Sequence, residues 1–184
     1  ATARDKETLD ALVDFITDFV SSEGFSTRRV PFEKCGDFLT VEINPGSKKA
    51  GLFMAHMDTV FDKGAFGEPP VRRDETRMYG PGVIDCKGGV VAAVMAMDAL
   101  MRCGFRKRPV KLIIQTDEET GSNTSNKQTL AFMLEKARDA IAFLNLEGVQ
   151  YGTAVLSRKG ILRYRFTVVG KSAHAAKCTV GANA

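Results

Sequence analysis

A histidine and an aspartate separated by one residue are the first side chains in this 184-residue sequence that could do chemistry. His56 follows the apolar run 51–54, and Asp58 comes two positions later. In an extended strand, side chains two positions apart lie on the same face. An aspartate placed there can accept the imidazole N–H that does not face a metal ion, which fixes the tautomer of the histidine. Taken alone, the pair is equally typical of a polar strand end before a turn.

A second carboxylate, Asp85, lies in a stretch rich in glycine and proline at residues 79–89. Residues of these types indicate a tight backbone path rather than an ordinary surface loop. The next segment, 90–103, is apolar on nearly every face, which predicts a buried helix that packs on a sheet. Asp85 is therefore expected on a rigid turn that leads into this helix. A helix N-cap is the alternative role for it.

Acidic residues also follow two further apolar runs. The run 110–115 leads into three consecutive acids at 117–119, and the run 140–146 is followed by Glu147. Adjacent carboxylates at the end of a strand repel one another unless a cation compensates their charge. A plain acidic loop is the alternative for the three acids taken in isolation.

Four apolar strands are thus expected to deliver a histidine or acids at their carboxyl ends, the edge at which open parallel α/β sheets bind ligands. A set of nitrogen and oxygen donors suits Zn²⁺ or a similar divalent ion, and a carboxylate-rich site can hold two such ions. The expected ligands are His56, Asp85, Glu119 and Glu147. Glu118, next to a ligand, would be the general base that takes a proton from metal-activated water.

The elements that must position these residues alternate between helices and strands. An amphipathic pattern predicts a helix over 5–22, an apolar run predicts a strand over 38–43, and a further helix is expected over 128–138. Such alternation indicates an α/β fold with a mixed sheet. The chain is expected to leave this domain near residues 156–160, and the alternating segment 161–169 then predicts an antiparallel strand.

These residues and their order resemble the aminoacylase/carboxypeptidase family of two-zinc metallopeptidases, which includes glutamate carboxypeptidases, acetylornithine deacetylase, succinyl-diaminopimelate desuccinylase and peptidase T. The matching segments are 55–60, 80–89, 116–122, Glu147 and 170–175. The resemblance implies a zinc exopeptidase-like catalytic domain over residues 1–157, in which helices sandwich a mixed β-sheet. It also implies that residues 158–184 begin a smaller α+β lid or dimerisation domain, through which the intact protein forms a homodimer.

By the same resemblance, the intact protein holds two zinc ions, which cobalt or manganese could replace. His56 and Glu147 resemble ligands of one ion, and Glu119 resembles a ligand of the other. Asp85 resembles the carboxylate that bridges both ions, and the peptide bond after it is commonly cis in the family. Asp58 resembles the carboxylate that orients the histidine ligand.

Two further roles are carried over from the family. Glu118 resembles the general base, and His174 resembles a histidine that the lid presents to a neighbouring subunit's active site, where it stabilises the oxyanion. A solvated loop histidine is the alternative for His174. Members of the family run to about twice this length and carry a second metal-ligating histidine, whereas His174 is the only other histidine here. We therefore interpret the sequence as a piece of a longer protein.

The function implied by the resemblance is hydrolysis of a peptide or N-acyl amide bond of a small substrate by an exopeptidase, a carboxypeptidase or a deacylase. One alternative is an aminopeptidase of the same fold. The other is a non-catalytic homologue that binds metal or ligand without turnover. The pair Glu118 and Glu119 argues against the second alternative, because a pure binder needs no base.

Composition argues against two classes of partner. The net charge is +4, and the basic residues are scattered without an aromatic-interleaved face, so no nucleic-acid partner is expected. No apolar stretch is long enough to span a bilayer, so no membrane partner is expected. The four cysteines show no paired or CxxC spacing, which predicts free thiols in a reducing compartment and a cytoplasmic location.

Overall fold

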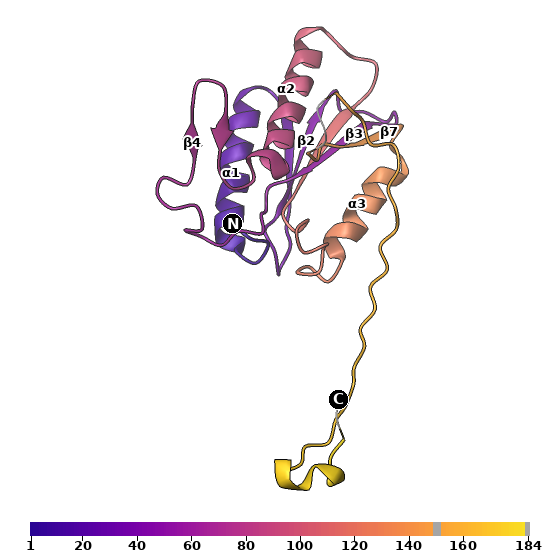
Figure 1. Ribbon diagram of the computed structural model, residues 1–184. Coiled ribbons are helices and arrows are strands. Elements are labelled where there is room, and N and C mark those ends of the chain that lie inside the picture. The colour runs from indigo at the N-terminus through magenta and orange to yellow at the C-terminus, as the bar shows by residue number, and fades with distance from the viewer. Residues whose placement is uncertain (149–151, 183–184) are drawn as a thin grey trace. The chain divides into compact units, whose positions relative to one another are not determined.

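The computed structural model describes residues 1–148 and 152–182, and the chain divides into two compact units, Ala1–Gly148 and Val149–Ala184. The first unit holds a five-stranded sheet of order β1-β2-β6-β3-β7 (Figure 1). Its strands are β1 (Ser26–Val30), β2 (Phe38–Ile43), β3 (Gly51–His56), β6 (Val110–Gln115) and β7 (Ala142–Asn145). Its helices are α1 (Lys6–Ser22), α2 (Gly88–Arg102) and α3 (Gln128–Arg138). A separate small sheet pairs β4 (Arg72–Arg73) with β5 (Met78–Tyr79).

The sheet is mixed, as the sequence predicts. Strand β3 runs parallel to both of its neighbours, β6 and β7, whereas β2 is antiparallel to both β1 and β6. The carboxyl ends of β3, β6 and β7 therefore meet at one edge, where His56 is the register partner of Gln115. Strand β1 was not predicted, because its sequence Ser-Thr-Arg-Arg-Val offers one apolar residue and its side chains lie at an exposed edge.

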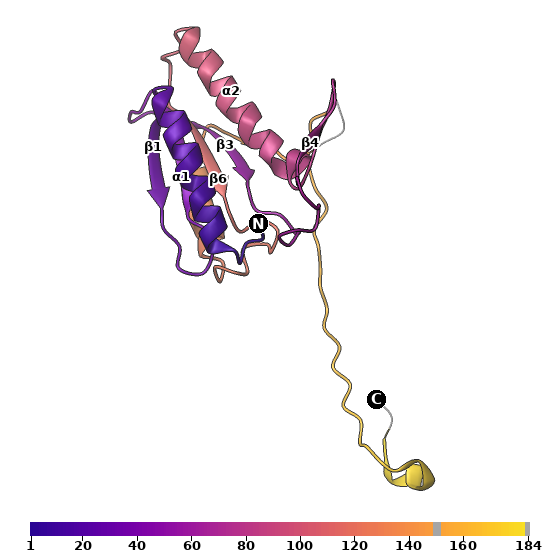
Figure 2. The same cartoon turned by 90° about the vertical axis from the view of Figure 1, so that its left-hand side faces the viewer.

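Alternating residues of the strands send side chains into two separate cores. Leu112 and Ile114 of β6 pack with the helices α1 and α2 on one face, whereas Ile113 packs towards Met133 of α3 on the other. Figure 1 shows these two helices and α3 on opposite sides of the sheet, and in Figure 2 α1 and α2 face the viewer. This is the two-residue periodicity expected of a strand that is covered on both faces. The predicted sandwich of helices around a sheet is confirmed.

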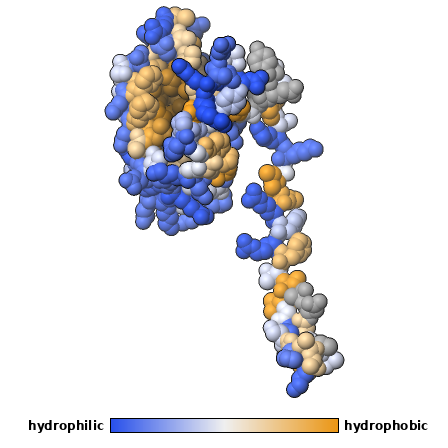
Figure 3. All heavy atoms as spheres, turned by 60° about the vertical axis from the view of Figure 1, so that its left-hand side comes forward, coloured by the Kyte–Doolittle hydropathy of each residue, from blue (hydrophilic) through white to orange (hydrophobic). Residues whose placement is uncertain are grey.

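Helix α2 corrects one prediction, since only one stripe of it is buried. Val90, Ala93 and Met97 face the sheet, but Met95 is 66% exposed. Figure 3 shows a hydrophobic hollow on the face that α1 and α2 share, and Phe15 and several neighbours from both helices line it. Apolar residues on every side of a helix do not indicate how many neighbours cover it, so the sequence overestimated the burial of α2.

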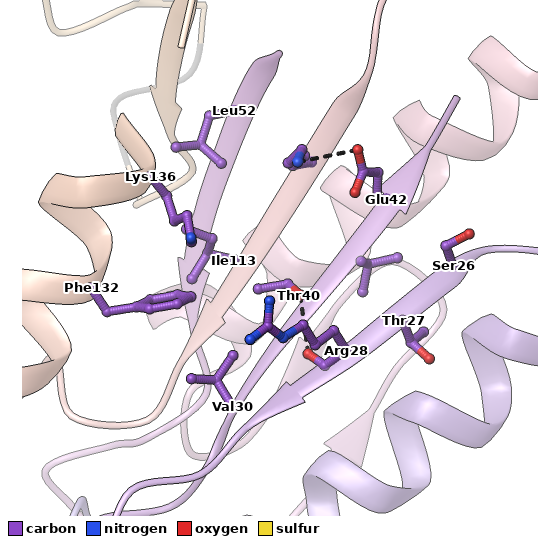
Figure 4. A pocket seen from close by; sticks show the side chains of 12 residues that line it. Ser26, Thr27, Arg28, Val30, Thr40, Glu42, Leu52, Ile113, Phe132 and Lys136 are labelled. Atoms are coloured by element: carbon purple, nitrogen blue, oxygen red, sulfur yellow. Dashed lines mark hydrogen bonds and ion pairs between the residues drawn. The ribbon is translucent and has the colours of Figure 1, made fainter. Parts of the chain in front are cut away.

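The opposite face of the sheet is covered by α3 over only part of its area. A shallow pocket lies beside that helix, and Figure 4 shows Arg28, Phe132 and Lys136 along it. The ammonium of Lys136 lies 5.3 Å from the centre of the Phe132 ring. The ligands predicted from the sequence all lie elsewhere, so this pocket is separate from the candidate site.

The second unit contains one short helix, η2 (Ala175–Val180), and a bridge between Lys171 and Ala182 among its described residues. The predicted strand at 161–169 is wrong for this structure, because no strand is assigned there and the side chains are exposed. A strand needs a paired neighbour for its N–H and C=O groups, and the described part of this unit supplies none to that segment. The predicted boundary at 157/158 and the lid stay predictions. Across the described residues, no helix has the length and apolar character to cross a membrane.

Candidate metal centre

The buried ring of His56 is the centre around which the acidic residues gather. His56 ends β3, and three carboxylates from other segments approach its Nε2 atom. The nearest oxygen belongs to Asp85 at 2.9 Å, followed by Glu147 at 3.5 Å and Glu118 at 3.8 Å. Carboxylates converging on one imidazole nitrogen form a donor set that suits a divalent cation.

Asp58 joins His56 to the loop that carries the acids. Its carboxylate lies 3.3 Å from Nδ1 of His56, and the side chain is fully buried. The same carboxylate accepts hydrogen bonds from the backbone N–H groups of Glu118, at 3.3 Å, and Glu119, at 3.0 Å. The buried Asp58 side chain therefore contacts the predicted ligand His56 at the end of β3. It also contacts the backbone of the predicted base and of a second predicted ligand in the loop after β6.

Asp85 lies on a turn that leads into α2, as expected, so three strands rather than four deliver the histidine and the acids. It lies in η1 (Val83–Lys87), an irregular turn in which Asp85 itself has φ −110° and ψ 93°. The Asp85–Cys86 peptide is cis, as the family resemblance implies. Gly82 before the turn has φ +74°, a conformation that favours glycine, and α2 follows directly. The Asp85 side chain is 64% exposed, so its carboxylate is accessible to a ligand.

The thiol of Cys86 anchors this turn to β3. The buried sulfur accepts a hydrogen bond from the backbone N–H of His56 at 3.0 Å and donates to its carbonyl at 3.5 Å. The sulfur also lies within reach of a metal ion held by His56 and Glu147. Cys35, Cys86 and Cys103 are free, in line with the prediction, and the side chain of Cys178 lies outside the described residues.

The three consecutive acids after β6 do not converge, contrary to the reasoning that they need a shared cation. Asp117 is fully buried and turns away from the site. It accepts hydrogen bonds from the Thr120 hydroxyl and from the Ser125 backbone N–H, the latter at 2.9 Å. These bonds lower the pKa of Asp117 although burial by itself would raise it. Asp117 thus fixes the loop that presents Glu118 and Glu119.

Glu147 follows β7 and leaves a buried oxygen without a partner. Its Oε1 atom has no hydrogen-bond donor among the described residues, although it lies 3.5 Å from Nε2 of His56. Buried carboxylate oxygens are normally paired, so an unpaired one beside an imidazole nitrogen fits a cation ligand. The oxygens of Asp85 and Glu119 form a second cluster with the same imidazole, and all three donors lie within 4.8 Å of one another.

The titratable groups of the site shift one another's pKa values. Burial is the largest effect that raises the pKa of Glu118 and of Glu119, and neighbouring carboxylates add to it. Burial alone would lower the pKa of His56, but hydrogen bonds, first among them that of Asp58, raise it well above its ordinary value. Titratable groups that perturb one another in this way are typical of functional sites.

The structure also brings in Lys87, which the sequence reasoning missed. Its partly buried ammonium has Asp58 and Glu119 among its electrostatic neighbours, and desolvation lowers its pKa against their attraction. A lysine two positions after Asp85 in a glycine-rich turn was the available signal. His174, by contrast, is exposed in the second unit, where its Nδ1 accepts a hydrogen bond from the Ala176 N–H at 3.2 Å. Its predicted role stays a prediction.

Comparison with known proteins shows the family of the chain. Residues 52–168 match the model of peptidase family M20/M25/M40. The chain belongs to that family. Carboxypeptidase G2 of Pseudomonas sp. (strain RS-16) is 31% identical over 186 residues, which cover 98% of this chain and 44% of that protein. Acetylornithine deacetylase of Pasteurella multocida is 32% identical over 113 residues, or 59% of this chain and 29% of that protein.

Solved structures agree with the M20/M25/M40 fold. Human carnosine dipeptidase 1 matches with a TM-score of 0.59 and 19% identity, over 77% of this chain and 33% of that one. The M20 family metallo-carboxypeptidase Sso-CP2 of Sulfolobus solfataricus matches with a TM-score of 0.58 and 22% identity, over 78% and 34%. The chain thus spans less than half the length of each of these relatives.

Proposed function

We propose that this member of the M20/M25/M40 family is a divalent-metal hydrolase of a peptide or N-acyl amide bond in a small substrate. One observation carries the proposal: carboxylates from separate segments converge on the buried imidazole of His56, and one of their buried oxygens, Oε1 of Glu147, has no hydrogen-bond donor among the described residues. His56 and Glu147 would hold one ion, Glu119 the other, and Asp85 both. Zinc is the proposed metal, and cobalt or manganese could replace it.

The chain's own residues divide the chemistry between positioning and proton transfer. When bound, the metal supplies Lewis-acid polarisation of the scissile carbonyl and lowers the pKa of a water from about 15.7 towards about 7. Glu118 accepts the proton of the attacking water and passes it to the leaving amine. Asp58 holds the imidazole of His56 through Nδ1 and fixes the backbone of Glu118, so the ligand and the base keep a constant separation.

The substrate proposal follows from the names of the relatives. They include a carboxypeptidase, an acetylornithine deacetylase and a β-Ala-Xaa dipeptidase. Amide bonds next to a free amino acid are common to these names, so dipeptides and N-acyl amino acids are the substrates to test. An aminopeptidase or a binder without turnover is the alternative outcome.

The decisive experiment replaces Glu118 by Gln in the protein as its gene encodes it. Turnover of dipeptides and N-acyl amino acids should be lost, while metal content measured by plasma emission stays unchanged. Glu135→Gln is the matched control, because Glu135 lies exposed on α3 beside Lys136. Near-normal rates in Glu118→Gln would exclude this residue as the base, and inactivity of the unaltered protein on both substrate classes would favour the binder.

The proposed assembly is a homodimer in which His174 of one subunit donates to the oxyanion in the other subunit's site. Mixing a His174→Ala variant with a Glu118→Gln variant tests this arrangement. Each variant should be inactive alone, and subunit exchange should restore part of the activity, because one site per mixed dimer then has both residues. Absence of recovery after confirmed exchange would exclude action in trans.

A further inference from the structure

The side chain of Lys87 folds back beneath its own turn. The backbone N–H of Lys87 donates to the Gly82 carbonyl at 2.8 Å, and its ammonium donates a long hydrogen bond to the Pro81 carbonyl at 3.4 Å. A methyl group on Gly82 would lie 2.5 Å from the ammonium nitrogen, so the ammonium is packed against the backbone of Gly82. Lys87 therefore closes the turn that contains Asp85 with both its backbone and its side chain.

The ammonium has no single acidic partner that would account for its position. The carboxylates of Asp58, Glu119 and Asp85 attract it electrostatically. Within the described part of the chain, however, no carboxylate forms an ion pair with it. Lys87 is partly buried, and its ammonium contacts backbone atoms of the turn instead of a carboxylate. These contacts stabilise the turn and do not neutralise any one acid.

We propose that Lys87 is a positioning residue of the metal centre. Its ammonium holds the turn 81–87 closed and thereby sets the Asp85 carboxylate 2.9 Å from Nε2 of His56. Gly82 complements this arrangement, because a side chain there would displace the ammonium. This inference rests on the proposed function, since it concerns the ligand that would bridge the two ions.

Positioning and charge predict opposite effects on metal affinity. A positive charge close to the site repels a cation, so its removal should strengthen metal binding if charge alone mattered. If the turn depends on the ammonium, its removal releases Asp85, and metal binding should weaken. The sign of the change therefore separates the two roles.

The experiment is a Zn²⁺ titration, with a competing fluorescent chelator, of the metal-free protein as its gene encodes it. Lys87→Met should weaken Zn²⁺ binding at least tenfold, the lower range for residues that orient a metal ligand. Lys136→Met on α3 is the matched control and should bind Zn²⁺ like the unaltered protein. Lys87→Arg should also weaken binding, because it keeps the charge but its planar guanidinium cannot occupy the space against Gly82.

A double-variant cycle completes the test. If Lys87 acts through Asp85, the double variant Lys87→Met with Asp85→Asn should bind Zn²⁺ no more weakly than Asp85→Asn alone. Unchanged or tighter binding by Lys87→Met, or fully additive losses in the double variant, would overturn the proposal. If Lys87→Met does not fold, unchanged affinity in Lys87→Arg overturns it. Absence of Zn²⁺ binding by the unaltered protein would instead refute the proposed function itself.

Discussion

Replacement of Asp58 by Asn removes the negative charge of a carboxylate that contacts both His56, at the end of β3, and the loop after β6. The Asp58 carboxylate accepts hydrogen bonds from the backbone N–H groups of Glu118 and Glu119, and it lies 3.3 Å from Nδ1 of His56, which also contacts the Asp58 backbone carbonyl at 3.1 Å. Asn offers one acceptor oxygen, and its NH₂ group meets a backbone N–H in place of the second oxygen. At least one hydrogen bond to a charged acceptor is lost in a fully buried position, which costs about 1.5–3 kcal/mol.

This loss should divide between the stability of the fold and the affinity for metal. Since about 1.4 kcal/mol corresponds to a factor of ten, the Zn²⁺ affinity of Asp58→Asn should fall roughly 10- to 100-fold if most of the loss falls on the site. Urea unfolding of the metal-free protein measures the remainder. Zn²⁺ titration together with unfolding gives both parts. Unchanged affinity and unchanged stability in Asp58→Asn would refute the role of Asp58 as the joint between His56 and the acidic loop.

Two further predictions concern the fold. Asp37 is buried and bonded to a lysine, an arginine and a backbone N–H, and these hydrogen bonds lower its pKa although burial alone would raise it. The stability that the Asp37 carboxylate contributes is therefore present above its unfolded pKa and is lost as the pH falls through the lower folded pKa. In urea unfolding, Asp37→Asn should lower the free energy of unfolding by about 1.5–3 kcal/mol at pH 7. The loss should become progressively smaller below about pH 4. A constant deficit across that range would contradict this reasoning. On α2, Met97→Ala should lower the free energy of unfolding by about 2–5 kcal/mol, because Met97 is fully buried. Met95 is exposed, so Met95→Ala should change that free energy by less than about 0.5 kcal/mol. Equal losses would mean that the exposed face of α2 is covered in solution.

Much of the fold could be predicted because its patterns are local. The strand 38–43 and the helix 128–138 occur with the predicted bounds. The helix predicted over 5–22 begins at Lys6, and Asp5 caps it by accepting a hydrogen bond from the Thr8 N–H. Apolar runs followed by acids or histidine predicted which residues would meet, because parallel strands place their carboxyl ends at one edge.

What could not be predicted depends on the path of the backbone and on the groups that this path brings together. Asp117, Glu118 and Glu119 are chemically alike, yet the hydroxyl and amide donors around Asp117 remove it from the site. Likewise, the alternating pattern of 161–169 describes a strand only if another strand pairs with it. The position of Lys87 depended on the path of a glycine-rich turn, for which residue type gives no direction.

The parallel pairing of β3 has a consequence for the order in which the molecule assembles. Gly51 pairs with both Val110 and Ala142, so the two ladders beside His56 close only after long intervening segments have been ordered. Such contacts are slow to form, and the donors around the imidazole come together only when both ladders exist. A cation would then find few of its ligands assembled before the folding barrier is crossed. Metal binding at this centre would chiefly slow unfolding and leave the folding rate almost unchanged.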